Sequence, residues 1–78
     1  MAFTATLLEK HREEDNVVTK VQYEFTGEIN ETIIVDIYHF RPTDAQHVID
    51  NIYGRGQSEE SKLIAQKNID NILPDIIL

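Results

Sequence analysis

The fold of this chain is decided by residues 17–26, which read Val17-Val18-Thr19-Lys20-Val21-Gln22-Tyr23-Glu24-Phe25-Thr26. Apolar or β-branched side chains at the odd positions alternate with mostly polar ones at the even positions. This period of two is typical of a strand that buries one face and leaves the other in water. Residues 17–26 therefore predict an amphipathic β-strand.

Two further strands are predicted on either side of it. Residues 2–9 alternate in the same way, and residues 31–40 are rich in β-branched side chains. The polar run at residues 11–16 predicts a solvated connection, and residues 27–30 have the composition of a turn. Such short connections favour an antiparallel meander.

The third strand is unusual because its second face is also partly apolar. Ile34, Tyr38 and Phe40 fall on the side opposite the predicted core face. One interpretation is that a helix or the C-terminal tail covers these side chains. The other is that they form a partner-binding patch.

Helical periodicity begins after Pro42, which ends the third strand. Thr43 and Gln46 fit a capping box, in which each side chain bonds a free backbone N–H of the first helical turn. Apolar residues at helical spacing continue as far as Tyr53, and Gly54 is suited to a left-handed C-terminal cap. The sequence thus predicts a first helix that ends at Gly54.

A second helix is predicted after a short loop at residues 55–57. Ser58 can cap it, and the helix extends to about Leu73. Glu59 and Glu60 would lie favourably against the positive end of its dipole. Leu63 points away from the apolar stripe of this helix, so we expect it to be exposed or used by a partner.

These elements together predict one α+β domain over residues 1–78, with a three-stranded antiparallel meander followed by two α-helices packed on one face. Seventy-eight residues are too few for two separate cores. The residues predicted to form the core are Phe3, Val21, Tyr23, Phe25, Ile33, Val35, Ile37, Val48, Ile49, Ile52, Ile69 and Ile72.

The C-terminal segment is apolar and, like the second face of the third strand, has no assigned packing partner. Pro74 stops the second helix, and Ile76, Ile77 and Leu78 follow it. Burial of large aliphatic side chains contributes roughly 1.5 to 3 kcal/mol each, so we do not expect this tail to remain in water. It either docks on its own sheet or belongs to an interface.

Composition excludes several classes of function. The chain has no cysteine, which rules out thiolate catalysis, cysteine-ligated metals and disulfides. We find no apolar stretch of about 20 residues and no signal-peptide pattern, and we expect no membrane partner. A soluble protein, not secreted by a signal peptide, is therefore expected.

The net charge of −7, from 14 acidic and 7 basic residues, disfavours direct binding to nucleic acid. Acidic side chains gather at two places in the sequence. These acidic patch candidates are Glu13, Glu14 and Asp15 in the polar connection, and Glu59 and Glu60 at the predicted start of the second helix. They allow an alternative interpretation, in which the protein mimics nucleic acid.

No motif for catalysis, cofactor binding or metal binding is found. His39 and His47 with a nearby aspartate could in principle hold a metal, but aspartate and histidine at helical spacing are usually solvated neighbours. Ser58 lacks the setting of a nucleophile and suits a helix cap. Residues 54–56 fall short of a phosphate-binding loop. We therefore predict no catalytic, cofactor-binding or metal-binding residue and no enzyme.

The N-terminal part of the chain carries a resemblance. Residues 1–8 read Met1-Ala2-Phe3-Thr4-Ala5-Thr6-Leu7-Leu8, and after a charged stretch residues 21–26 form a strand. This pattern over about the first 26 residues resembles small proteins of tailed bacteriophages, many of which begin with a similar M-A-[YF]-T-A-T-L stretch. The resemblance implies a minor virion or assembly component, or a small protein acting on a host factor, and thus a place in the host cytoplasm or the virion. It assigns no functional residue.

The sequence thus favours a non-enzymatic protein–protein interaction module that binds a protein partner or itself, as a small phage virion or assembly protein. The alternative is an acidic phage-encoded inhibitor that mimics nucleic acid and binds a host defence protein.

Overall fold

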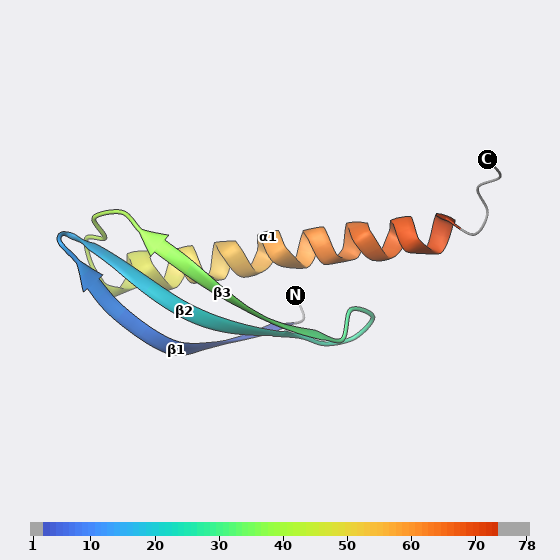
Figure 1. The fold of residues 1–78 in the computed structure, drawn as a ribbon, viewed down its shortest axis with the longest axis horizontal. Coiled ribbons are helices and arrows are strands. Elements are labelled where there is room, and N and C mark those ends of the chain that lie inside the picture. The colour runs from blue at the N-terminus through green and yellow to red at the C-terminus, as the bar shows by residue number, and fades with distance from the viewer. Residues whose placement is uncertain (1–2, 74–78) are drawn as a thin grey trace.

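A computed structural model describes residues 3–73 of the chain (Figure 1). Three strands come first, followed by one long helix. Their bounds are β1 (Phe3–Glu13), β2 (Asn16–Phe25), β3 (Glu31–His39) and α1 (Ala45–Ile72). The strands form an antiparallel sheet in the order β1-β2-β3, which confirms the predicted meander and the α+β class. The tail residues Ile76, Ile77 and Leu78 lie outside the described residues.

Strand β1 is longer than the sequence predicted. It continues to Glu13, which pairs with Asn16 across a two-residue turn, so only Glu14 and Asp15 remain of the expected connection. A β-bulge at Leu8 shifts the register between β1 and β2. The extra residue breaks the alternation of side chains along the strand. For this reason the sequence predicted a strand that ends at Glu9.

The two predicted helices are one continuous helix of 28 residues. Gly54 does not cap a first helix, and residues 55–57 do not form a loop. Ser58 lies inside the helix instead of at its start, and so do Glu59 and Glu60. The N-terminal cap is Asp44, not Thr43, because the Asp44 carboxylate accepts a hydrogen bond from the His47 backbone N–H at 2.9 Å.

Gly56 serves helix packing instead of chain termination. It is the buried residue of α1, and a Cβ atom placed on it would lie 2.5 Å from the Phe3 ring and 2.9 Å from the Tyr23 ring. A close approach of this kind requires a residue without a side chain. A hydrogen bond of 2.6 Å from the Tyr23 hydroxyl to the Ile52 carbonyl oxygen holds the helix against the sheet nearby.

The fully formed core is small. Val21, Tyr23, Phe25 and Ile37 are buried, and the side chain of Phe3 packs against Tyr23 and Phe25. Partly buried residues around this centre include several of the predicted ones. They are Phe3, Ile29, Ile33, Val35, Ile52 and Leu63.

Three predicted core residues on the helix are instead exposed. Ile49, Ile69 and Ile72 each have more than half of their surface in water. Leu63, which was expected to point away, packs against the core. A single uninterrupted helix explains the positions of Leu63, Ile69 and Ile72, because Leu63 falls on the face of Ile52 and Gly56 whereas Ile69 and Ile72 fall on other sides. Ile49 shares the face of Gly56 and lies nearer the start of the helix.

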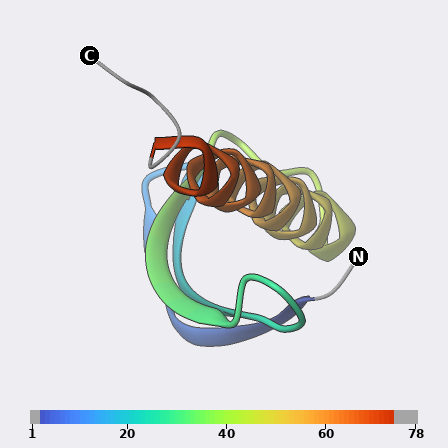
Figure 2. The same ribbon diagram turned by 90° about the vertical axis from the view of Figure 1, so that its right-hand side faces the viewer.

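The molecule is elongated, and its sheet curves around one side of the helix (Figures 1 and 2). Its radius of gyration is 15.7 Å, compared with roughly 11 to 12 Å for a compact domain of this length. The C-terminal part of α1 extends beyond the β2–β3 turn (Figure 1). Every described residue from Ile64 onward is exposed.

Candidate functional site

His39 occupies a buried polar cluster beneath the helix. Its Nε2 lies 2.8 Å from Thr19 Oγ1, and its Nδ1 lies 3.1 Å from Asn51 Nδ2. Since the Asn51 amide donates to Nδ1, Nε2 carries the proton and donates to Thr19. Burial, together with the nearby charge of His47, lowers the pKa of His39 below its usual value. The cluster favours neutral imidazole and joins β2, β3 and α1.

The two histidines singled out for a metal do not share a site. Both ring nitrogens of His39 are engaged within the cluster, and His47 Nδ1 accepts a hydrogen bond from the Thr43 backbone N–H at 3.3 Å. Within residues 3–73, no group of three or more histidine, aspartate or glutamate side chains is close enough to hold a metal ion.

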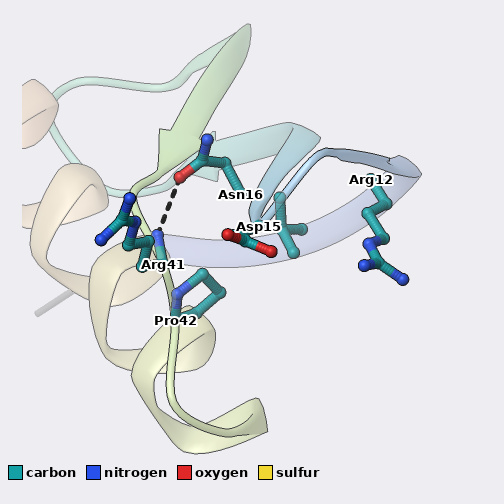
Figure 3. A pocket seen from close by; sticks show the side chains of 6 residues that line it. Arg12, Asp15, Asn16, Arg41 and Pro42 are labelled. Atoms are coloured by element: carbon teal, nitrogen blue, oxygen red, sulfur yellow. Dashed lines mark hydrogen bonds between the residues drawn. The ribbon is translucent and has the colours of Figure 1, made fainter.

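A shallow hollow of about 490 Å³ lies beside the β1–β2 turn (Figure 3). Asn16 Oδ1 accepts a hydrogen bond from the Arg41 backbone N–H at 3.0 Å there. The side chains of Arg12 and Arg41 point in different directions, and the carboxylate of Asp15 lies between them (Figure 3). The hollow therefore does not gather its two arginines around a common anion site.

The two acidic patch candidates lie far apart. Glu59 is close enough to Tyr23 to influence the pKa of its hydroxyl, and Tyr23 pairs with Ala5 on β1. Glu13 is eight positions further along β1, which corresponds to about 25 Å at ~3.3 Å per residue. The residues of the two candidates, Glu13, Glu14 and Asp15 on one side and Glu59 and Glu60 on the other, are therefore not brought together.

Glu59 is also largely neutralised by its neighbours. Its carboxylate accepts a hydrogen bond of 2.9 Å from Arg55 Nε and lies 3.5 Å from the Lys62 ammonium. The bond from Arg55 is the main reason why the pKa of Glu59 falls below its usual value. Glu59 thus belongs to a local ion-pair network on α1.

Large apolar side chains are exposed on several parts of the described surface. On the outer face of the sheet, away from α1, Ile34 and Tyr38 are each 57% exposed. Phe40 follows the end of β3, is 66% exposed, and has the Arg41 guanidinium over its ring. The helix packs on the opposite face of the sheet, so the expectation that a helix covers these side chains is wrong. We call Ile34, Tyr38 and Phe40 the outer-face patch.

A second apolar surface lies between β1 and the helix. It is a groove of about 310 Å³, and its lining is mainly apolar. The ring of Tyr53 leans on Phe3 beside it, with 5.4 Å between the ring centroids. We call this feature the β1–α1 groove, and it is lined by Ala5, Leu7, Ile49, Ile52 and Tyr53.

The sequence did not predict this groove. Ile49 and Ile52 were both assigned to the core, whereas the helix turns only Ile52 toward the sheet centre. The sequence of β1 did contain a sign of the groove. Ala5 and Leu7 share the core face with Phe3, and no residue of the predicted helices was assigned to cover them.

A third apolar surface lies on the part of α1 that extends beyond the sheet. Its large side chains are between 46% and 55% exposed. We call it the helix extension, formed by Ile64, Ile69, Ile72 and Leu73. Ile69 and Ile72 were predicted to lie in the core, and their exposure corrects that prediction.

Comparison with known proteins gives no relative for this arrangement. No protein-family model matches the chain, and neither a curated protein nor a solved structure matches it. Within the part of the chain that the structure describes, no helix is long and apolar enough to cross a membrane.

Proposed function

We propose that this chain is a non-enzymatic protein–protein interaction module, and that it serves as a small virion or assembly protein of a tailed bacteriophage. One observation carries the proposal. Among residues 3–73, four apolar residues are buried in the core, whereas eleven large apolar side chains are exposed. Surfaces of this kind on small proteins mark places where a partner binds.

The energetics support the same proposal. Burial of a large apolar side chain contributes about 1.5 to 3 kcal/mol, and the core of this chain offers few such contributions. A partner that covers the outer-face patch, the β1–α1 groove or the helix extension would add to the stability of the folded chain. The phage context rests on the N-terminal resemblance alone.

The alternative function, an acidic inhibitor that mimics nucleic acid, rests on the net charge of −7. The two proposals differ in their response to salt. Contacts between exposed charges are screened strongly above about 0.1 M salt, whereas apolar contacts are not. A mimic would release its partner as the salt concentration rises, and an apolar module would retain it.

Affinity capture from cells of the natural source tests the proposal, with bound proteins identified by mass spectrometry after washes at low and high salt. Three single variants probe the three apolar surfaces separately: Tyr38→Ser, Tyr53→Ser and Ile69→Ser. Each changes a side chain that is more than half exposed, so each variant should fold. We expect a partner, or further copies of the chain, to survive high salt and to be lost from one variant. Equal retention by all four proteins, or no retention and no self-association, would contradict the proposal.

A further inference from the structure

The two edges of the sheet differ in how they are protected against pairing with another strand. In the order β1-β2-β3, both β1 and β3 have one side without a strand partner among the described residues. Each therefore presents backbone N–H and C=O groups that can pair with another chain. Natural proteins usually block such edges with bulges, charged side chains or proline.

Strand β1 has this protection. A bulge at Leu8 interrupts its ladder. Lys10 and Arg12 lie on the same side as the core residues, since Lys10 pairs with Thr19 and Arg12 with Val17. Charges that point toward the core side of an edge strand discourage pairing. The edge of β1 is therefore poorly suited to strand addition.

Strand β3 has much less protection, because it has no bulge and no proline, and Glu31 at its start is its only charge on the core side. Its register with β2 is regular over all nine residues, and it contains no lysine, arginine or proline. Its middle, residues 32–38, is Thr-Ile-Ile-Val-Asp-Ile-Tyr, which has high β-propensity and a single charge. An edge of this composition would promote aggregation unless a strand covers it.

We propose that a second copy of this chain covers the β3 edge, so that two β3 strands pair antiparallel about a twofold axis and form a six-stranded sheet. This inference rests on the proposed interaction function and names the partner. A twofold axis perpendicular to the sheet makes the two β3 strands antiparallel, because the interface is isologous. A hydrogen-bonded strand pair also requires residues of the same sheet face to lie opposite each other.

A register centred on Val35 satisfies these conditions best, because it pairs all nine residues of β3. Val35 then faces Val35 of the second copy, and Ile33 faces Ile37 of the second copy on the inner side. On the outer side Thr32 faces Tyr38 of the second copy, and Ile34 faces Asp36 of the second copy. The two Ile34 side chains become diagonal neighbours, so part of the outer-face patch is covered by association.

The position of Asp36 is unfavourable in this register, because it faces the apolar Ile34 of the second copy. The two Asp36 side chains are also diagonal neighbours across the axis, although each has Lys20 opposite it on its own β2 strand. Asp36→Asn should therefore strengthen association by a few fold, since it removes a like-charge pair.

Light scattering coupled to size-exclusion chromatography tests the pairing over about 1 to 300 µM chain, a range that covers weak and tight dimers. The wild-type chain should form a dimer. Ile34→Glu should weaken it by about tenfold or more, because each new carboxylate then lies directly opposite Asp36 of the second copy. The control is Ile69→Glu on the helix extension, where the replaced side chain is 55% exposed compared with 57% for Ile34. This control should leave the dimer unchanged.

Disulfide cross-linking gives a second measurement that does not depend on the glutamate variant. The chain has no cysteine, so Thr32→Cys combined with Tyr38→Cys places two thiols opposite each other across the proposed interface. The double variant should oxidise to a covalent dimer. Either single variant should not, because its two thiols would be six positions out of register, or about 20 Å apart.

Three results would overturn the inference: a wild-type monomer at all concentrations, a dimer lost in Ile69→Glu but kept in Ile34→Glu, or a double-cysteine variant that does not cross-link. The proposed function would survive each of them if affinity capture identifies a different protein partner. It would fail separately if the chain neither self-associates nor captures a protein.

Discussion

At the residue scale, the buried imidazole of His39 has the clearest chemical consequence. Its hydrogen bonds to Thr19 and Asn51 use both ring nitrogens and link two strands to the helix. Burial and the nearby charge of His47 lower the pKa of His39, so the folded chain favours the neutral ring. The unfolded chain takes up a proton near the ordinary value of 6.5. Protonation therefore favours unfolding.

We expect the free energy of unfolding to be largest above pH ~6.5 and to fall as the pH drops through that value toward the lowered pKa of His39. Urea unfolding at pH values from about 7.5 to about 5.5 measures this decrease. His39→Gln should remove much of it, while His11→Gln, a change on the exposed strand β1, should retain it. An equal decrease in both variants would contradict the role given to His39.

Tyr23 connects the sheet to the helix through a single hydroxyl group. Tyr23→Phe should lower the free energy of unfolding by about 1 to 3 kcal/mol, because the Ile52 carbonyl loses its 2.6 Å donor in a partly buried place. Tyr53→Phe is the matched control, since the Tyr53 ring is 52% exposed. Guanidinium denaturation of both variants measures the difference, and equal stability of the two would show that the bond contributes little.

At the scale of elements, two glycines of α1 have different roles although they are two positions apart. A Cβ added to Gly54 would have no atom within 4 Å, whereas a Cβ on Gly56 would meet the rings of Phe3 and Tyr23. The Phe3 ring cannot easily move away, because it also packs against Phe25 and Tyr53. Gly54 is therefore tolerated in the helix, whereas Gly56 is required by the packing.

Alanine at each glycine tests this difference. Gly54→Ala should stabilise the chain by up to about 1 kcal/mol, the usual gain from removing a helical glycine. Gly56→Ala should destabilise it, since overpacking costs about 1 to 3 kcal/mol and exceeds that gain. Thermal and chemical denaturation report both effects. The opposite order would indicate that the helix ends at Gly54.

The strands could be predicted from the sequence because their alternation is local, whereas the helix could not. Gly54 and Ser58 match the local rules for a helix end and a helix start. Those rules were outweighed by tertiary contact, because Ile52, Gly56 and Leu63 recur on one face at spacings of four and seven. That longer pattern was visible in the sequence. The need for glycine beneath two aromatic rings was not.

The exposed apolar surfaces were only partly predictable for a related reason. Ile34, Tyr38 and Phe40 were identified correctly as lying outside the core face, because strand alternation assigns faces directly. The β1–α1 groove and the helix extension depend on the rotation and length of α1. Neither surface could be predicted, because the sequence analysis ended a first helix at Gly54.

At the scale of the whole molecule, the sheet has one protected edge and one unprotected edge. The bulge in β1 and the charges near its end hinder pairing of that edge with another strand. The regular β3 strand leaves its edge suited to pairing. Because only four apolar residues among residues 3–73 are buried in the core, association would add directly to the stability of the folded chain.

Amide hydrogen exchange by NMR on the full chain, at about 1 mM, tests association through β3 most directly. In an unpaired edge strand only alternate amides are hydrogen-bonded within the sheet, so protection alternates along the strand. We predict that consecutive amides of β3 are protected, whereas those of β1 beyond the bulge show alternating protection. Alternating protection along β3 as well would contradict pairing of this edge with a second copy.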